Sequence, residues 1–595
     1  MGLLVCATAA APVSAELLPG ADSVVARYVK ATGGDSALAA QRSVRLKGRI
    51  ESSGLTGRWE MTMAAPDLWV RRIVLGPLRL REGFDGQVSW RTDLSEKSVT
   101  VQTEAEARHA REEGWFLNEQ WALQDQGGGT VKPRSTSYGD AGIQDVMEIT
   151  PPGGTPRILS IGRKAGFVTR VTGERDNRSF EERPAQYRLL AGRKRWTLDE
   201  APTYFRTDQP IERMTVDSAW VNEPLDPAHF SPPSLSGRAI AWQKSRDTVR
   251  APFFYTSKTV LVRVSIQGAP PEDFILDTGA SLTLLDYDYA LQLKLQLEGE
   301  SSVQGVAASA GIRFARVHSI ALPGRRATAA TLRDFRVAVI DMGEHSDALM
   351  WRKPVGILGA DFLSHFAVEL DYDAQMLTLH DPASFRYAGR GAALPFETFH
   401  GIPVVDLTLN GNCAGKFIVD VGNAFYFTVH GSRVRPCRML ATTSRKEVEV
   451  AGSGAGGGFV GTLCRLDSLR IGPFAWEQPV AALTLNTNGL IGSEDIAGNI
   501  GNTFLQRFKV TFDYGRNVLY LEPGRTFHER DRVSRFGALF ARIGRRVFAG
   551  NVLTGSAAYD AGLRWYDEII AVDDKPLDRW SREDVDRLLE AGEAG

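Results

Sequence analysis

Alternating apolar and polar positions predict β-strands along most of the chain. The clearest runs are KTVLVRVSIQG (258–268) and GIPVVDLTLNG (401–411), and each ends at a turn glycine. An aspartate follows that glycine by nine residues in both cases, Asp277 in the first and Asp420 in the second. Each acid comes after a hydrophobic strand and stands two residues before a glycine. The pattern therefore indicates an internal repeat with one carboxylate at a fixed point in each copy.

A second pair of matching segments supports the repeat. GADFLSHFAVELDY begins at Gly359 and GNTFLQRFKVTFDY begins at Gly501, and seven of the fourteen positions are identical. The aspartate precedes this glycine by 82 residues in the first copy and by 81 in the second. We therefore expect 255–385 and 395–525 to be two copies of one β-rich lobe, related by a pseudo-twofold axis.

Two such lobes would bring their carboxylates face to face. Two carboxylates in contact cannot easily both ionise, so they share a proton. One can then take a proton from water while the other, protonated, polarises a carbonyl. This arrangement predicts peptide hydrolysis without a covalent intermediate, and it calls for no metal or organic cofactor.

The first copy resembles a retropepsin-type aspartic protease lobe. The resemblance rests on Asp277-Thr278-Gly279-Ala280-Ser281 and on the later Ile357-Leu358-Gly359, and with the second copy it extends over 255–525. It implies that the aspartate is catalytic, that the threonine hydroxyl bonds across the lobe interface, and that the glycine lets the backbone pass close to the carboxylate. It also implies a flap in each copy, for which GVAASAG (305–311) and AGSGAGGG (451–458) are the candidates.

The second copy departs from the motif. Asp420 and Gly422 remain, but Val421 replaces the threonine, and Asn423 stands near the serine or alanine position. Valine keeps the shape of threonine and loses its hydroxyl, while Asn423 still offers an amide that can donate to the carboxylate.

Three hypotheses follow. The first is an aspartic endopeptidase that uses both aspartates. The second is a catalytically inactive lipid- or peptide-binding protein. The third is a homodimer that pairs two first lobes, each contributing Asp277.

The C-terminal part, 533–595, resembles a PDZ domain of the bacterial protease-associated kind. The resemblance rests on GSAAYDAGLRWYDEIIAVDDKPL (555–577). It implies a carboxylate-binding loop at Gly537-Ala538-Leu539-Phe540, capture of a peptide C-terminus by strand addition, and a groove-lining helix over 581–595.

The N-terminal part, 21–235, resembles the half-barrel domains of periplasmic lipoprotein carriers. Its start predicts a helix, a Gly-Gly turn and a second short helix before a series of strands. The resemblance implies a cavity for an acyl chain. A structural domain without a ligand is the alternative.

The chain begins with MGLLVCATAAAPVSA, which suits a signal peptide cleaved after Ala15. We therefore expect an exported, periplasmic protein of mainly β, multidomain fold, and we leave association with a membrane open. Cys413, Cys437 and Cys464 remain after export, and they allow at most one internal disulfide. The net charge of −1 and the lack of a long basic run argue against nucleic acid as a partner.

Overall fold

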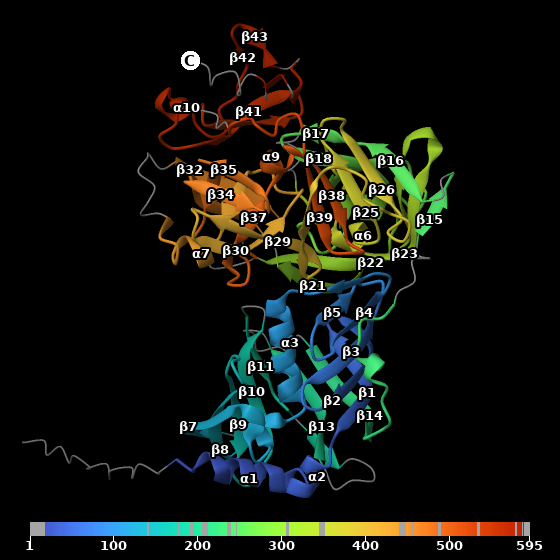
Figure 1. Ribbon diagram of the computed structural model, residues 1–595, viewed down its shortest axis with the longest axis vertical. Coiled ribbons are helices and arrows are strands. Elements are labelled where there is room, and N and C mark those ends of the chain that lie inside the picture. The colour runs from blue at the N-terminus through green and yellow to red at the C-terminus, as the bar shows by residue number, and fades with distance from the viewer. Residues whose placement is uncertain are drawn as a thin grey trace, which may run out of the picture. The chain divides into compact units, whose positions relative to one another are not determined.

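The computed structural model is mainly β, as the alternating sequence predicts (Figure 1). It describes residues 18–139, 142–175, 178–184, 186–189, 196–204, 212–234, 240–244, 247–304, 309–343, 351–439, 448–454, 457–485, 490–531, 536–577, 580–582, 584–585 and 587. The expected signal peptide, 1–15, lies outside these residues, as does most of the expected helix over 581–595.

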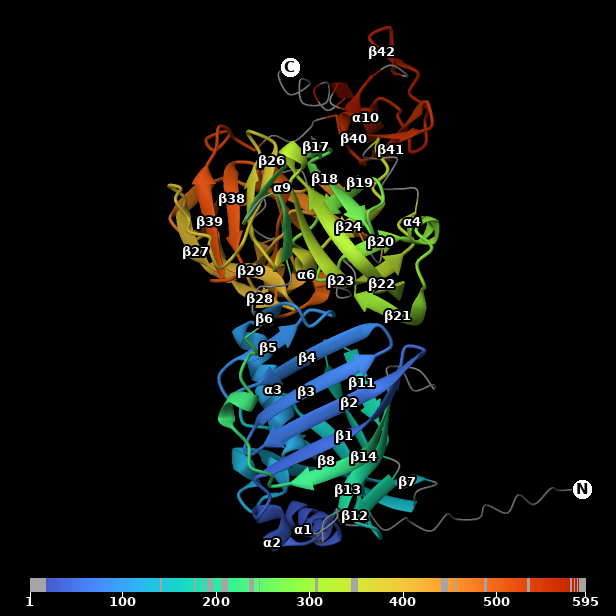
Figure 2. The same ribbon diagram turned by 90° about the vertical axis from the view of Figure 1, so that its right-hand side faces the viewer.

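The N-terminal part begins with the two predicted helices, α1 (Ala21–Ala31) and α2 (Asp35–Ala39), on either side of the Gly33-Gly34 turn. A long sheet follows, in the order β6-β5-β4-β3-β2-β1-β14-β13-β11-β10-β9-β8-β7, with β12 on β13 (Figure 2). Its strands are β1 (Ser43–Ser52), β2 (Leu55–Ala64), β3 (Leu68–Leu75), β4 (Leu78–Phe84), β5 (Ser89–Thr92), β6 (Val99–Val101), β7 (Thr130–Gly139), β8 (Gly142–Thr150), β9 (Arg157–Gly162), β10 (Val168–Arg175), β11 (Arg178–Glu182), β12 (Gln186–Leu189), β13 (Trp196–Tyr204) and β14 (Glu212–Val221).

Helix α1 and the end of α3 (Glu104–Leu117) pack on the far strands of this sheet. Val24 and Tyr28 of α1 share a buried cluster with Trp115 of α3 and with Met147 and Ile149 of β8. Removing these large apolar side chains from water is what attaches the helices to the sheet.

The first lobe is a sheet in the order β15-β23-β20-β24-β19-β18-β22-β21, with β17 on β18. Its elements are β15 (Ile240–Gln243), β17 (Phe254–Thr256), β18 (Thr259–Ile266), β19 (Glu272–Leu276), β20 (Leu284–Asp286), α4 (Tyr287–Gln292), β21 (Glu298–Gln304), β22 (Ser309–Pro323), β23 (Ala329–Ile340), β24 (Gly356–Leu358) and α6 (Ala360–Leu363). The parallel pair of β19 and β24 sets Leu276 opposite Leu358, so the turn that begins at Asp277 lies beside Gly359.

The second lobe repeats this plan. Its sheet runs β32-β33-β36-β31-β37-β30-β29-β34-β35, with β28 on β29. Its elements are β28 (Glu397–Phe399), β29 (Ile402–Leu409), β30 (Cys413–Val419), β31 (Phe427–Val429), α7 (Gly431–Val434), β32 (Val448–Gly454), β33 (Gly457–Arg465), β34 (Ser468–Ile471), β35 (Phe474–Glu477), β36 (Val480–Leu483), β37 (Gly498–Ile500) and α9 (Asn502–Leu505). The parallel pair of β30 and β37 sets Val419 opposite Ile500, as β19 and β24 do in the first lobe.

A third sheet joins the two lobes. Its order is β16-β26-β25-β38-β39-β27, and β25 of the first copy pairs antiparallel with β38 of the second. Its strands are β16 (Thr248–Pro252), β25 (Ala367–Asp371), β26 (Met376–His380), β27 (Ala392–Pro395), β38 (Phe508–Asp513) and β39 (Val518–Pro523). One apolar core runs through both lobes, with Phe362, Phe366, Phe504, Phe508 and Phe512 fully buried in it. This shared core fixes the two halves of the repeat against each other.

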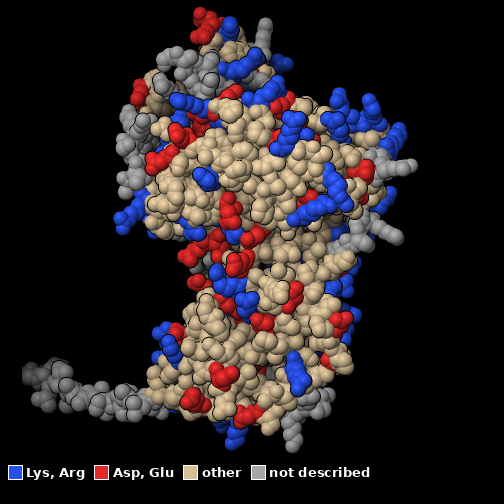
Figure 3. All heavy atoms as spheres, viewed as in Figure 1, with Lys and Arg blue, Asp and Glu red and all other residues tan. Residues whose placement is uncertain are grey.

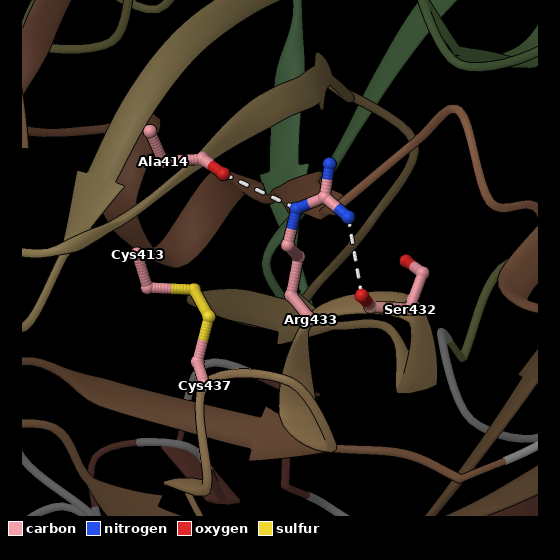
Figure 4. Close-up of a disulfide and its surroundings, with 5 residues drawn as sticks. All are labelled: Cys413, Ala414, Ser432, Arg433 and Cys437. Atoms are coloured by element: carbon pink, nitrogen blue, oxygen red, sulfur yellow. Dashed lines mark hydrogen bonds between the residues drawn. A yellow bond between two sulfur atoms is a disulfide. The ribbon is translucent and has the colours of Figure 1, made fainter.

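A disulfide links Cys413, at the start of β30, to Cys437, which follows α7 (Figure 4). The two Cα atoms are 5.9 Å apart and the cysteines are separated by 24 residues. A bridge that closes a loop of this length stabilises the fold by about 3 kcal/mol. Beside it, Arg433 Nε donates to the Ala414 carbonyl at 3.1 Å, which adds a second tie between β30 and α7.

The two tyrosines at the ends of β25 and β38 have different surroundings. Tyr372 Oη donates to Asn502 Oδ1 at 2.6 Å, and both residues are buried. Tyr514 occupies the matching place in the second copy, but Ala360 stands where Asn502 stands in the repeat. Among the described residues, the Tyr514 hydroxyl has no hydrogen-bond partner.

The difference between the two tyrosines can be tested by comparing Tyr372→Phe with Tyr514→Phe. Tyr372→Phe is expected to lower the free energy of unfolding by about 1–3 kcal/mol, because it leaves a buried amide oxygen unpaired. Tyr514→Phe is expected to change it little or to raise it, because no partner is lost. Chemical denaturation of both variants measures the difference, and equal losses would contradict the assignment.

The C-terminal part contains β40 (Ala538–Ile543), β41 (Arg546–Val552), α10 (Ala557–Asp560), β42 (Ala571–Val572) and β43 (Lys575–Pro576) around Phe540, Val547 and Leu577.

Lysine and arginine side chains are interspersed with aspartates and glutamates on the face of the molecule in Figure 3. Among the described residues, no helix is both long and apolar enough to cross a bilayer.

Candidate active site

Asp277 and Asp420 lie at equivalent points of the two lobes. Each aspartate follows a hydrophobic strand, and its backbone N–H continues the strand pairing, to Leu358 O at 3.1 Å in the first lobe and to Ile500 O at 2.9 Å in the second. The chain then turns back on each carboxylate. Gly279 N donates to Asp277 Oδ1 at 2.8 Å, and Gly422 N donates to Asp420 Oδ1 at 3.0 Å.

The two carboxyl groups face each other across the lobe interface, and each packs on the glycine of the opposite turn. A Cβ built on Gly279 would lie 2.5 Å from Asp420 Cγ, and one built on Gly422 would lie 2.2 Å from Asp277 Cγ. Real Cβ atoms do not approach this closely, so only glycine fits at either position. The two carboxyl groups lie close enough for each to change the acidity of the other.

This contact changes the acidity of the pair. Burial among protein atoms raises the pKa of Asp277, and hydrogen bonds from the Gly279 and Ala280 N–H groups and from Asp420 oppose the rise. Burial raises the pKa of Asp420 well above its usual range, and the negative charge of Asp277 raises it further. Both side chains remain half-buried, so solvent reaches the pair. Two such groups in contact favour a state in which the pair carries one proton.

Thr278 connects the lobes through its hydroxyl. Its side chain is fully buried, and Oγ1 donates to Val419 O at 2.6 Å and accepts from Val421 N at 2.9 Å. Val421 has no hydroxyl, so its side chain cannot make the reciprocal bond to the first lobe. The hydroxyl hydrogen bonds across the interface therefore come from the first lobe, where Thr278 bonds to both Val419 and Val421.

The other predicted support residues lie in the same two turns. Ser281 is half-buried in the turn after Asp277. Asn423, which we expected to donate to the carboxylate, directs its Oδ1 to its own loop, where it accepts from Phe425 N at 2.9 Å. The side chain that donates to Asp420 is Asn499, with Nδ2 at 2.9 Å from Oδ2. Sequence reasoning missed this residue, although it stands where the repeat has Ile357.

Hairpins are present where the flaps were expected. Strands β21 and β22 pair antiparallel from Gln304 and Ser309, and β32 and β33 pair antiparallel from Gly454 and Gly457. The tips between these strands, 305–308 and 455–456, lie outside the described residues.

The predicted peptide-binding loop lies in the C-terminal part. Gly537 has a positive φ of 73°, and its carbonyl accepts from Leu553 N at 2.8 Å. Ala538, Leu539 and Phe540 follow as the first residues of β40, with Ala538 and Phe540 buried and Leu539 exposed.

Within the described part of the chain, no group of three or more His, Cys, Asp or Glu side chains could hold a metal ion.

Comparison with known proteins gives one match to a family model. Residues 262–362 match the model described as aspartyl protease. The segment contains Asp277, Thr278 and Gly279 and ends within α6. No curated protein matches the chain.

Solved structures resemble parts of the chain at low identity. An aspartic proteinase from Irpex lacteus is 14% identical, with a TM-score of 0.31, over 48% of this chain and 100% of that one. A putative outer membrane lipoprotein-sorting protein domain from Vibrio parahaemolyticus is 9% identical, with a TM-score of 0.25, over 35% of this chain and 95% of that one. A LolA superfamily protein from Nitrosomonas europaea is 11% identical, with a TM-score of 0.26, over 36% of this chain and 98% of that one.

Proposed function

We propose that the protein is an aspartic endopeptidase in which Asp277 and Asp420 act on one water molecule. The observation that carries this proposal is the reciprocal packing of each carboxyl group on the glycine of the opposite turn. Such packing fixes two carboxyl groups in contact at the point where the lobes meet. The match of 262–362 to the aspartyl protease model supports the assignment.

The acidities of the two aspartates suggest how the pair acts. Burial raises the pKa of both, so the pair holds one proton over the working pH range. The ionised carboxylate takes a proton from the attacking water, and the protonated one donates its proton to the carbonyl oxygen of the peptide. Attack forms the new C–O bond and gives a gem-diol. As the C–N bond breaks, the carboxyl group that took a proton from water gives it to the leaving nitrogen, and a hydroxyl of the diol returns a proton to the other carboxylate, so the pair again carries one proton.

The flanking parts of the chain suggest which substrate and ligands the enzyme binds. The substrate is a polypeptide, and we assign 533–595 to the capture of a peptide C-terminus at Gly537–Phe540. We assign 21–235 to a domain that takes an acyl chain or lipid. The apolar segment at 1–15 and the disulfide support export to an oxidising compartment such as the periplasm.

The pH dependence of cleavage is expected to follow the raised pKa values of the two aspartates. The active form carries one proton on the pair, so activity should fall at low pH as the second proton binds, and at high pH as the pair loses its remaining proton. Ordinary carboxyl groups have pKa values of about 4. Burial raises the pKa of both aspartates, so the bell-shaped profile of kcat/KM should be centred above that pH. Initial rates at constant ionic strength test this, and a profile centred below pH 3 would contradict it.

Cleavage of a denatured protein by the wild type and by Asp277→Asn tests the proposed activity. We expect new internal peptide termini with the wild type, identified by mass spectrometry, and a loss of about 10²–10⁴-fold in the variant. No cleavage by the wild type at any pH would overturn the proposal in favour of a catalytically inactive binding protein.

A further inference from the structure

The two carboxyl groups of the proposed site receive their second hydrogen bond in different ways. Each aspartate accepts one N–H from the glycine of its own turn. For Asp277, the further group that favours the ionised carboxylate from its own turn is the backbone N–H of Ala280, which acts to lower its pKa. Asp420 receives its second donor from a side chain, Asn499 Nδ2, at 2.9 Å from Oδ2.

The repeat shows that this side chain is a local substitution in an otherwise apolar position. Asn499 is the central residue of β37, paired with Ile418 on one side and Thr428 on the other. Ile357 is the central residue of β24, paired with Ile275 and Leu284. The two strands match in length, register and neighbours, but only the second lobe places an amide beside its aspartate.

His430 lies behind this amide. Its ring is buried, and burial lowers the pKa of His430 to about 4, so the ring is neutral over most of the pH range. Hydrogen bonding to the Ile496 carbonyl and to Asn499 opposes that lowering. Neither His430 Nδ1 nor Asn499 Oδ1 has a hydrogen-bond partner among the described residues. A neutral imidazole carries a single ring proton, so it can donate to the Ile496 carbonyl or to Asn499 but not to both.

His430 itself replaces an acid. In the first lobe, Asp286 precedes α4 and accepts from Asp288 N and Tyr289 N, which caps the helix. In the second lobe, His430 precedes α7 at the matching place, and among the described residues no side chain caps α7. The substitution at this place therefore gives up a cap and puts a neutral ring behind Asn499.

We propose that Asn499 is a positioning residue that orients Asp420 and stabilises its ionised form in the second lobe. It takes the place of the backbone donor of the first lobe. This inference rests on the proposed endopeptidase function, since it assigns Asn499 a part in that reaction. The groups that act on Asp420 are the Asp277 carboxyl, the Gly422 N–H and the Asn499 amide, so Asn499 is the side chain to change without altering the pair itself.

The test compares Asn499→Leu with Ile357→Leu, the matched change in the first lobe. A hydrogen bond to a charged group is worth enough to shift a pKa by about one to two units. We expect Asn499→Leu to move the alkaline limb of the kcat/KM profile upward by about that amount and to lower the maximum about tenfold or more. Ile357→Leu should leave the profile in place. Asn499→Asp, which has the same shape but adds an acid, should move the limb at least as far upward.

A second measurement does not depend on activity. A raised pKa in the folded protein makes stability fall as pH rises through that pKa. The free energy of unfolding of Asn499→Leu should therefore continue to fall to a higher pH than that of Ile357→Leu. If the wild type cleaves nothing, the proposed function fails, and this comparison still decides the role of Asn499. Identical pH dependence of stability, or an unmoved alkaline limb in an active Asn499→Leu variant, would overturn the inference.

Discussion

Replacing Gly422 with alanine is expected to abolish cleavage while leaving the protein folded. The new Cβ would lie 2.2 Å from Asp277 Cγ, 2.4 Å from Oδ1 and 2.5 Å from Oδ2. Gly422 does not have a positive φ, so its backbone accepts an alanine and the strain comes from this contact alone. The carboxyl groups must then separate, so they no longer lie close enough to share a proton. General acid–base catalysis contributes about 10²–10⁴-fold, and we expect a loss of that size.

Gly279→Ala should act in the same way, because its Cβ would lie 2.5 Å from Asp420 Cγ. Gly162→Ala is the control, since a Cβ there would meet nothing closer than 3.7 Å. The measurement is kcat/KM on a denatured protein substrate, with circular dichroism to show that the fold is kept. A folded Gly422→Ala variant with the activity of the wild type would show that the two carboxyl groups need not touch.

Asp361→Asn is expected to stabilise the protein at alkaline pH by about 4 kcal/mol. Asp361 is buried in α6, where its Oδ1 accepts from Thr283 Oγ1 at 2.6 Å and from Phe362 N at 2.8 Å. Burial raises the pKa of Asp361 to about 7, against 3.8 for an ordinary aspartate. The folded state therefore binds the proton more tightly than the unfolded state. Stability is highest below about pH 4, falls as pH rises towards 7 and stays low above it.

The asparagine variant has no proton to lose at this position, so it should lack that fall. Chemical denaturation of the wild type and of Asp361→Asn at pH 4 and pH 8 measures the difference. We expect the gain at pH 8 and little gain at pH 4, where the wild-type carboxyl is protonated. Thr503 occupies the matching place in the second lobe, so the effect belongs to the first lobe alone. An equal difference at both pH values would contradict a buried, protonated Asp361.

The repeat could be predicted from the sequence because its physical causes are local. A buried strand requires apolar residues, as in FIL (274–276) and FIV (417–419). A backbone that passes close to a carboxyl group requires glycine. These patterns predict that each copy places an aspartate and a glycine in the same turn, which are Asp277 with Gly279 and Asp420 with Gly422. Their contact across the interface follows from the pseudo-twofold axis, which the matched spacing of the two copies indicates.

The departures from symmetry could not be predicted in the same way. Asn499 donates to Asp420 from a strand 79 residues away, and that partner depends on the parallel pairing of β30 with β37. The one available signal was a polar residue at a position where the first copy has Ile357. Likewise, three cysteines do not say which two are paired, because the pair depends on how the chain turns after α7.

The rate of cleavage by Asp420→Asn tests the central claim most directly. If the two aspartates of one chain share the catalytic proton, this variant should lose about 10²–10⁴-fold in kcat/KM, as Asp277→Asn does. The wild-type specific activity should also be independent of protein concentration. Wild-type activity in Asp420→Asn, rising with protein concentration, would contradict the account and point to pairs of first lobes, each contributing Asp277.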